Sequence, residues 1–527
     1  MEDREETAGT DVRGAVTDST GMSRPREAPL KLDADAFRAL GHSLVDEIAG
    51  FLDTLPERPV RPPVTPGELR ALLPQGELPE QGSDAAALLG STTRLLFDNS
   101  TFNGHPRFFG YITSSPAHIG ILGDMLAAAV NPNCGSWTLG PMATEIESQA
   151  VRWIAELMGY PADAGGVLVS GGNVANFTCF LAARTRMAQW DVRAGGLAAE
   201  DARRLTVYAS AETHTWIQKA ADLFGLGTDA IRWIPTDDEL RMDVAALRGT
   251  MEQDAARGLR PMMVVGTAGS VSTGAVDPLN EIADLCHERG VWFHVDGAYG
   301  GFAAAVPDSG ADFSGMERAD SVAVDPHKWL YTPLEAGCAL VRDAAALREA
   351  FAYHPPYYHF GEEATNYVDY GLQNSRGFRA LKVWLALRHA GRAGYERMIG
   401  DDIALTRRLH DNVVAHPDLD VFTSALSICT FRYVPAGLRP TLGDAATEEH
   451  LNRVNELVLD RIQTGGEAFV SNAVLRGTYV LRACIVNFNT TAADVDALPG
   501  IVTRLGREAD AELRGTDPHG LATRSST

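Results

Sequence analysis

Lysine is rare in this chain, and one lysine stands among residues suited to covalent chemistry. The 527 residues include four lysines (Lys31, Lys219, Lys328 and Lys382), so arginine supplies 42 of the 46 basic side chains. Lys328 lies in the run Asp325-Pro-His-Lys-Trp-Leu330, directly after an apolar segment. A neutral lysine amine forms a Schiff base with an aldehyde, which is how enzymes hold pyridoxal phosphate. We therefore expect Lys328 to be the covalent anchor of this cofactor.

A second run, His294-Val-Asp-Gly-Ala-Tyr-Gly-Gly301, supplies an acid upstream of the lysine. Asp296 ends an apolar segment, and the carboxyl ends of strands are where α/β sheets bind ligands. A carboxylate paired with the pyridine nitrogen keeps it protonated and makes the ring an effective electron sink. Ala298 follows with a side chain small enough to let the ring lie close. A structural role for Asp296, as a cap of the next turn, stays open.

Two further segments are expected at the same edge of the sheet. Ser170-Gly-Gly-Asn173 follows a strand and opens a helix, where free N–H groups attract a phosphate. It matches neither GxGxxG nor GxxxxGK[ST], so dinucleotide and nucleoside triphosphate sites lack their fingerprint. His214 lies at a strand-to-helix junction, where an imidazole can stack on the cofactor ring and transfer protons. Gly-Gly turns and helix-capping histidines also occur for structural reasons alone.

Short apolar segments alternate with helical patterns between residues 117 and 395. Strands are predicted at 166–170, 205–210, 261–266, 291–295, 321–324 and 339–341, and helices at 176–186, 214–225 and 278–289. This alternation predicts an α/β fold with a mainly parallel sheet covered by helices on both faces.

The flanking segments predict the domain organisation. We expect disordered tails at 1–30 and 513–527, an N-terminal helical segment at 31–115, a large cofactor-binding domain at 116–395 and a small C-terminal α+β domain at 396–512. The small domain is expected to contain a long helix near 396–415 and strands near 420–433 and 478–486. Apolar residues recur at helical spacing from Asp33 to Leu55, which predicts a helix with an Asp33 cap.

Composition excludes several classes of partner. The net charge of −23 argues against nucleic acid or an anionic membrane. The chain has no apolar run long enough for a membrane span, and its N-terminus does not resemble a secretory signal. The six cysteines are scattered without a CxxC pair, which predicts reduced thiols in the cytoplasm and no metal site.

Together these runs resemble the group II pyridoxal phosphate-dependent amino-acid decarboxylases, and the aromatic-L-amino-acid branch most closely. The resemblance covers residues 35–500 and rests on His105-Pro-Arg-Phe-Phe109, Ser170–Asn173, His214, His294–Tyr299, Asp325–Trp329 and Phe378-Arg-Ala-Leu-Lys-Val-Trp384. It implies a type I fold, like that of aspartate aminotransferase, with a seven-stranded sheet. It also implies a homodimer that converts an L-amino acid, aromatic by this likeness, to the amine and CO₂.

The resemblance assigns roles to single residues. Lys328 looks like the Schiff-base lysine, Asp296 the partner of the pyridine nitrogen and His214 the stacking histidine. The phosphate is assigned to Gly172, Asn173, Asp325 and His327. Tyr357 falls where the aromatic branch carries a tyrosine that returns a proton to the substrate Cα. Relatives that make aldehydes commonly have phenylalanine there, so Tyr357 favours simple decarboxylation.

Several positions depart from the family pattern. Val271 replaces a threonine that usually faces the cofactor, and Asn173-Val174 replaces a Ser/Thr-Glu pair. Asn133 and Gly135 stand where the animal aromatic enzyme has bulkier pocket residues, so a roomier or more polar pocket is expected. An indole, an imidazole or a branched aliphatic side chain would fit such a pocket.

Other activities stay open on the sequence alone. They are an aldehyde synthase, a transaminase or an aliphatic amino-acid decarboxylase on this scaffold, a nucleotide-dependent oxidoreductase, and a catalytically silent scaffold protein.

Overall fold

The computed structural model describes residues 15–17, 23–25, 28–197, 204–354 and 364–516. These residues belong to two compact units. The first unit comprises residues 1–58 and 64–100, and the second comprises residues 59–63 and 101–527.

The first unit is helical. Its elements are β1 (Ala15–Thr17), β2 (Ser23–Pro25), α1 (Ala34–Thr54), α2 (Pro66–Leu72) and α3 (Ala85–Asn99). The Asp33 carboxylate accepts two N–H groups from the first turn of α1, which confirms the predicted cap. Helices α1 and α3 pack together through Phe51 and Phe97, whose rings stack with centroids 4.3 Å apart.

The second unit is built around a seven-stranded sheet with the order β4-β10-β9-β8-β7-β5-β6. The strands are β4 (Gly165–Val169), β5 (Leu205–Ser210), β6 (Ile231–Ile234), β7 (Arg260–Thr267), β8 (Trp292–Asp296), β9 (Ser321–Val324) and β10 (Gly337–Val341). Strand β10 is antiparallel to both of its neighbours, and the other pairs are parallel. The predicted α/β fold with a mainly parallel sheet is confirmed.

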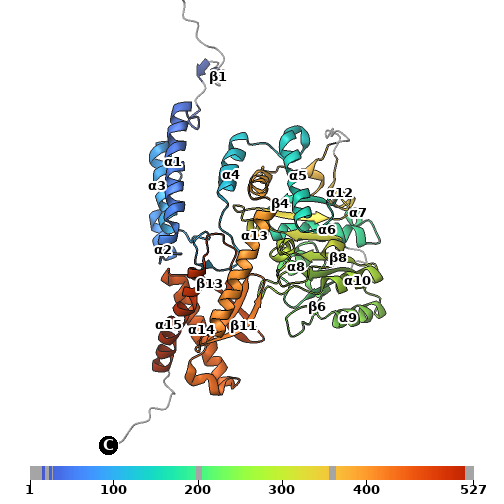
Figure 1. Ribbon diagram of the computed structural model, residues 1–527. Coiled ribbons are helices and arrows are strands. Elements are labelled where there is room, and N and C mark those ends of the chain that lie inside the picture. The colour runs from blue at the N-terminus through green and yellow to red at the C-terminus, as the bar shows by residue number, and fades with distance from the viewer. Residues whose placement is uncertain (1–14, 18–22, 26–27, 198–203, 355–363, 517–527) are drawn as a thin grey trace, which may run out of the picture. The chain divides into compact units, whose positions relative to one another are not determined.

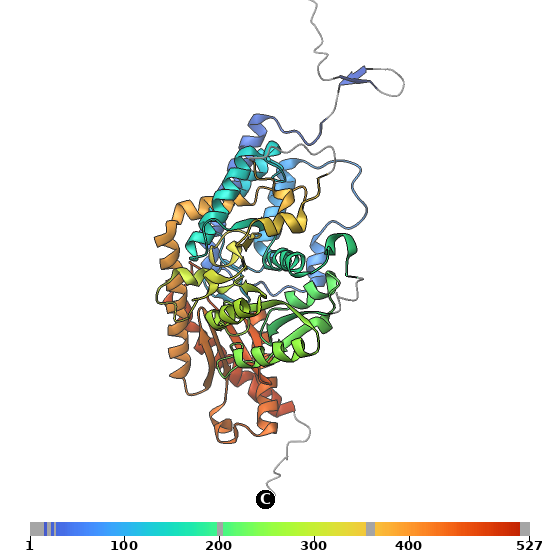
Figure 2. The same cartoon turned by 90° about the vertical axis from the view of Figure 1, so that its right-hand side faces the viewer.

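Helices cover both faces of this sheet (Figures 1 and 2). The helices of this region are α4 (His118–Val130), α5 (Pro141–Leu157), α6 (Gly172–Met187), α7 (Val192–Gly195), α8 (Trp216–Leu223), α9 (Val244–Ala256), α10 (Leu279–Arg289), α11 (Pro326–Trp329) and α12 (Ala345–Phe351); α4 packs against α13 instead of the sheet. On β5, Val207 and Ala209 pack with α6 and α8, whereas Tyr208 packs on the opposite face with α5 and α10. This alternation follows from the two-residue period of a strand and explains why the strands are apolar throughout.

A second, five-stranded sheet has the order β11-β12-β14-β13-β3 and lies in the same compact unit. Its strands are β3 (Phe108–Phe109), β11 (Leu419–Ala425), β12 (Ile428–Tyr433), β13 (Phe469–Leu475) and β14 (Thr478–Cys484), with helices α14 (Ala445–Gly465) and α15 (Ala492–Thr516). Strand β3 pairs in parallel with β13, so the His105–Phe109 segment joins the C-terminal sheet. The sequence predicts the segments of β11, β12 and β14 but not β3 or β13.

Helix α13 (Ala380–Val414) begins well before the predicted start near 396. Gly391 interrupts it with φ 65° and ψ 171°, and the helix changes direction there (Figure 2). The domain boundary expected after residue 395 falls inside this helix, and that division stays a prediction. Within the described ranges, no helix combines the length and the apolar character needed to cross a membrane.

Candidate active site

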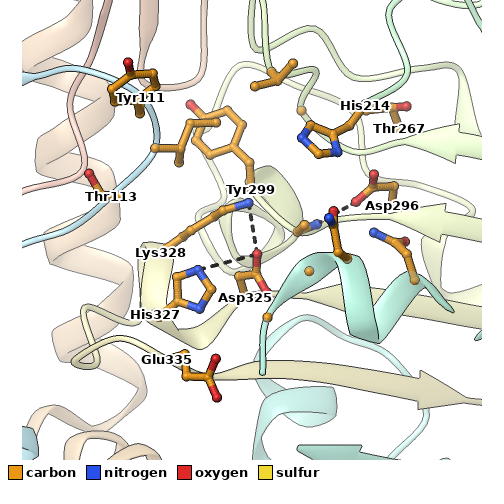
Figure 3. A pocket seen from close by; sticks show the side chains of 18 of the residues that line it. Tyr111, Thr113, His214, Thr267, Asp296, Tyr299, Asp325, His327, Lys328 and Glu335 are labelled. Atoms are coloured by element: carbon orange, nitrogen blue, oxygen red, sulfur yellow. Dashed lines mark hydrogen bonds and ion pairs between the residues drawn. The ribbon is translucent and has the colours of Figure 1, made fainter. Parts of the chain in front are cut away.

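A cavity of about 900 Å³ opens at the carboxyl edge of the large sheet. Strands β9, β8, β7 and β5 are parallel neighbours, so their carboxyl ends bring distant segments together. Eight of the nine predicted site residues line this cavity: Gly172, Asn173, His214, Asp296, Ala298, Asp325, His327 and Lys328 (Figure 3). The ninth, Tyr357, lies outside the described residues.

Lys328 lies in α11, and the carboxylate of Asp325, directly before this helix, holds it inside the cavity. Its Nζ lies 2.9 Å from Asp325 Oδ2 (Figure 3), and the lysine side chain is 20% exposed. Asp325 is buried, and its other oxygen, Oδ1, has no hydrogen-bond partner among the described residues. The amine is therefore accessible from the cavity and carries a local counter-ion.

His327 borders the same carboxylate. Its Nδ1 lies 2.7 Å from the Ala336 carbonyl oxygen, and its Nε2 lies 3.7 Å from Asp325 Oδ2. Burial lowers the pKa of His327. The ring is therefore neutral at pH 7, and both the N–H and the carbonyl oxygen of Ala336 lie within hydrogen-bond distance of Nδ1.

Asp296 ends β8 and is 6% exposed. Its Oδ1 accepts the Ala298 N–H at 3.2 Å, and its Oδ2 accepts the Trp216 indole N–H at 2.7 Å. In the part of the chain that the structure describes, no basic side chain forms an ion pair with this carboxylate. A charge held this way, facing a cavity, can pair with a cationic ring of a ligand.

His214 lies directly before α8, and its Nδ1 accepts the backbone N–H of Trp216 at 3.3 Å. The ring is exposed to the open cavity, yet the protein packed around it removes enough water to lower the pKa of His214. The ring is therefore neutral at physiological pH, with its proton on Nε2. A neutral imidazole in this position can stack on a planar ligand and donate a hydrogen bond from Nε2.

The turn between β4 and α6 forms a cradle that requires glycine. Gly171 has φ 127°, a conformation that favours glycine. A Cβ added at Gly172 would lie 2.7 Å from Asp325 Oδ2 and 3.1 Å from the Ala298 Cβ. The first N–H groups of a helix have no partner within the helix, so the start of α6, at Gly172 and Asn173, offers donors to a phosphate.

The structure adds site residues that the sequence did not reveal. Thr113 Oγ1, Thr267 Oγ1 and the Nε and Nη2 atoms of Arg482 are buried without a partner among the described residues, and all three residues line the cavity. Arg482 lies on β14 and is 3% exposed. Its Nη1 donates to Ser471 Oγ at 2.8 Å and to the Tyr111 carbonyl at 3.3 Å. One arginine among 42 carries no sequence signal, because its role depends on contacts between β13, β14 and the loop after β3.

Two residues expected to enlarge the pocket are held by contacts within the chain. A Cβ at Gly135 would overlap the Asn374 carbonyl oxygen, and Asn133 Oδ1 accepts the N–H groups of Gly135 and Arg376. Val271 lines the cavity of the single chain, and Asn133 and Gly135 are not among its described lining residues. Their expected effect on the size and polarity of the substrate pocket stays a prediction.

These residues fit pyridoxal phosphate. They combine an accessible amine for the aldehyde, a carboxylate without a cationic partner for the ring nitrogen, and a glycine cradle at a helix start for the phosphate. Asp325 Oδ1 and the Nε and Nη2 atoms of Arg482 add buried polar atoms without a partner among the described residues to the wall of this cavity.

Comparison with known proteins agrees with this geometry. The model of the pyridoxal-dependent decarboxylase conserved domain matches residues 66–434. An aromatic-L-amino-acid decarboxylase of Bacillus atrophaeus is 34% identical over 88% of this chain and 94% of its own length. A phenylacetaldehyde synthase of Petunia hybrida is 31% identical over 86% of this chain and 91% of its own.

Solved structures are similar over nearly their whole length. The crystal structure of Oryza sativa TDC with PLP and tryptamine has a TM-score of 0.84 and 30% identity, covering 92% of this chain and 99% of that one. A crystal structure of mouse CSAD has a TM-score of 0.83 and 28% identity, covering 90% and 99%. The type I pyridoxal phosphate fold is confirmed, and the chain belongs to the pyridoxal-dependent decarboxylase family, as a carboxy-lyase whose cofactor is pyridoxal 5′-phosphate.

Proposed function

We propose that this enzyme decarboxylates an aromatic L-amino acid to the corresponding amine and CO₂. The relatives named for aromatic substrates support the aromatic class: a decarboxylase in Bacillus atrophaeus and tyrosine decarboxylases in Narcissus pseudonarcissus and Arabidopsis thaliana. The observation that carries the proposal is the Arg482 guanidinium, whose Nε and Nη2 have no partner among the described residues and which borders the same cavity as the Lys328 amine.

Arg482 is proposed to bind the substrate α-carboxylate. A buried guanidinium with two unused donors is costly unless an anion pairs with it. Its Nη1 is already held by Ser471 and the Tyr111 carbonyl, so Nε and Nη2 present a fixed pair of N–H groups. Bidentate binding would orient the bond between Cα and the carboxylate, and this orientation decides which bond breaks.

The chain's residues are proposed to hold the cofactor and the proton. When bound, pyridoxal phosphate supplies an electron sink for the pair left as CO₂ departs. Lys328 would hold the cofactor through its aldehyde, and Asp325 would be the counter-ion of the lysine amine whenever that amine is free. Asp296 would hold the ring nitrogen, Ala298 would leave room for the ring, and His214 would cover its face.

The phosphate is proposed to lie at the N-terminus of α6, at Gly172 and Asn173, beside His327. Asp325 borders this cradle, where a Cβ at Gly172 would lie 2.7 Å from its Oδ2. His214 Nε2 or Tyr357 then returns a proton to the substrate Cα. Tyr357 at this position of the family favours the amine product over an aldehyde.

A product assay tests the proposal. Purified holoenzyme is incubated separately with L-tryptophan, L-tyrosine, L-phenylalanine, L-histidine and L-glutamate, and amine, CO₂, aldehyde and hydrogen peroxide are measured. We expect amine and CO₂ in equal amounts from an aromatic substrate, without peroxide. Aldehyde with peroxide and ammonia would establish the synthase activity named for the Petunia relative instead. Turnover of glutamate alone would contradict the aromatic assignment.

Arg482→Gln tests the carboxylate-binding role. A hydrogen-bonded charge contributes about 1.5–3 kcal/mol, so kcat/KM is expected to fall by roughly 10- to 100-fold. Arg476→Gln is the control, because Arg476 is an exposed arginine in the turn between β13 and β14. Equal activity of the two variants would contradict the role.

We also propose a homodimer. Helix α4 carries Leu122, Met125, Leu126 and Val130 on one face, each between 49% and 64% exposed in the single chain. An apolar stripe of this kind on a soluble helix indicates a protein interface, and a second copy of this chain is the proposed occupant. Analytical ultracentrifugation should give a dimer for the wild type and a monomer for Leu126→Asp. A wild-type monomer would contradict the proposal.

The proposed location is the cytoplasm. The six cysteines are all buried and unpaired, which suits a reducing compartment. Fractionation of cells that express the chain tests this, and recovery in the secreted fraction would contradict it.

A further inference from the structure

Trp216 contacts both groups that are assigned to the cofactor ring, although the two come from different strand ends. Its indole N–H donates to Asp296 Oδ2 at 2.7 Å, and its backbone N–H donates to His214 Nδ1 at 3.3 Å. Trp216 opens α8 and is fully buried, so it faces neither solvent nor substrate. One residue thus connects the carboxylate after β8 to the imidazole after β5.

The indole orients the carboxylate. Asp296 has two protein donors, the Ala298 N–H on Oδ1 and the Trp216 indole on Oδ2. A hydrogen bond to a charged acceptor is stronger and more directional than one between neutral groups. Without the indole, Oδ2 would keep no protein donor among the described residues, and the carboxylate would be free to turn.

A buried network fixes the indole itself. The His294 ring meets the Trp216 ring edge-on, with centroids 5.6 Å apart and an angle of 81°. His294 Nδ1 lies 2.8 Å from Ser321 Oγ and Nε2 lies 2.7 Å from Asn176 Oδ1, so both ring nitrogens are engaged. Ser321 Oγ also accepts the Trp292 indole N–H at 2.8 Å. The fixed His294 ring therefore packs against the Trp216 indole in the orientation that directs its N–H at Asp296.

We propose that Trp216 is a positioning residue that holds Asp296 and His214 in the arrangement that the cofactor ring requires. The inference rests on the roles proposed above for these two residues. It adds that the orientation of the Asp296 carboxylate depends on the Trp216 indole N–H, in addition to the position of Asp296 at the end of β8.

Trp216→Phe tests this in the full-length enzyme, because phenylalanine keeps an aromatic ring and removes the N–H. Trp384→Phe is the matched control, since the Trp384 indole donates to Gln149 Oε1 at 2.7 Å, outside the cavity lining. The readouts are the dissociation constant of pyridoxal phosphate, from titration of apoenzyme, and the pH at which the visible band of the bound cofactor titrates. We expect binding about 10-fold weaker or more in Trp216→Phe, with a shifted band titration, and neither change in Trp384→Phe.

A double-mutant cycle separates this role from mere core packing. In an Asp296→Asn background, Trp216→Phe should weaken cofactor binding much less than in the wild type, because the charged acceptor is gone. Equal effects in the two backgrounds, or wild-type binding and band titration in Trp216→Phe, would overturn the proposal.

A measurement on unmodified protein covers the case in which Trp216→Phe does not fold. The eight tryptophan indole N–H signals are observed by nitrogen-15 NMR before and after cofactor addition. The Trp216 signal should move and the Trp384 signal should not, and an unmoved Trp216 signal would overturn the proposal. Failure of the proposed function would appear differently, as wild-type enzyme that makes no amine.

Discussion

Asp402 is a buried carboxyl group that anchors the segment after Lys328, and its titration offers a quantitative test of the packing around the lysine. Its Oδ2 accepts the Trp329 indole N–H at 2.8 Å and the Tyr331 hydroxyl at 2.7 Å. Burial raises the pKa of Asp402 from its ordinary 3.8 to about 7. Asp402→Asn removes the charge and retains an acceptor oxygen for both donors.

The sign of the effect follows from the two pKa values. Between pH 3.8 and 7 the native state keeps the Asp402 proton and the unfolded state loses it. The contribution of Asp402 to the free energy of unfolding therefore falls as pH rises through this interval, and it stays low above pH 7. A shift of about three pH units, at roughly 1.4 kcal/mol each, corresponds to about 4 kcal/mol in total. Roughly 2.5 kcal/mol of this falls between pH 5 and pH 8.

The assay is guanidinium chloride unfolding at pH 5, 6, 7 and 8, at one protein concentration and with saturating cofactor. Asp402→Asn should gain roughly 2.5 kcal/mol relative to wild type on going from pH 5 to pH 8. Asp411→Asn, at an exposed carboxylate further along α13, is the control and should show no such gain. A difference between Asp402→Asn and wild type that is the same at pH 5 and pH 8 would refute the reasoning.

Three other substitutions test separate parts of the account. Gly172→Ala should weaken pyridoxal phosphate binding in an absorbance titration, because the new Cβ would lie 2.7 Å from Asp325 Oδ2. Gly249→Ala is the control, because its Cβ would have no atom within 4 Å, and it should bind the cofactor normally. Unchanged affinity in Gly172→Ala would count against the glycine cradle. Glu147→Leu should lower the free energy of unfolding by about 3–5 kcal/mol in a denaturant titration, because it leaves Arg376 buried without its ion-pair partner. The double variant with Arg376→Leu should recover part of this loss. An unchanged free energy of unfolding in Glu147→Leu would be inconsistent with a buried ion pair. Burial lowers the pKa of His214 below its ordinary 6.5. The fall in kcat/KM that protonation of His214 causes on the acid side should therefore lie below pH 6.5, and it should vanish in His214→Gln. A fall above pH 6.5 that depends on His214 would contradict this assignment.

The large sheet is predictable because its strands are short apolar runs bounded by turns. Leu205–Ser210 and Ser321–Val324 have the predicted bounds, since every residue in them is buried. Strand β6 is less clear from the sequence, because Trp233 within it is 43% exposed and the strand lies at the sheet edge. Strand β3 has two residues and exists only through its pairing with β13, which no local pattern encodes.

Some residues of the candidate site can also be predicted from the sequence, and others are revealed only by their contacts in the structure. Residues at strand ends, such as Asp296 and Lys328, are predictable because parallel strands place their carboxyl ends at one edge. Arg482 and Trp216 are not, because their roles depend on which atoms they meet from distant segments: Ser471 and Tyr111 for the arginine, and Asp296 for the tryptophan.

Lys328 is expected to be the one lysine that bonds to the cofactor, and chemical trapping identifies the modified lysine. Holoenzyme is reduced with borohydride, digested and mapped by mass spectrometry for a pyridoxyl-lysine peptide. Of the four lysines, Lys328 is the one that lines the cavity, whereas Lys382 pairs with Asp124 at 3.1 Å and Lys219 is exposed on α8. The account predicts the adduct on Lys328 and none on Lys31, Lys219 or Lys382. Stoichiometric labelling of any other lysine, with Lys328 unmodified, would contradict it.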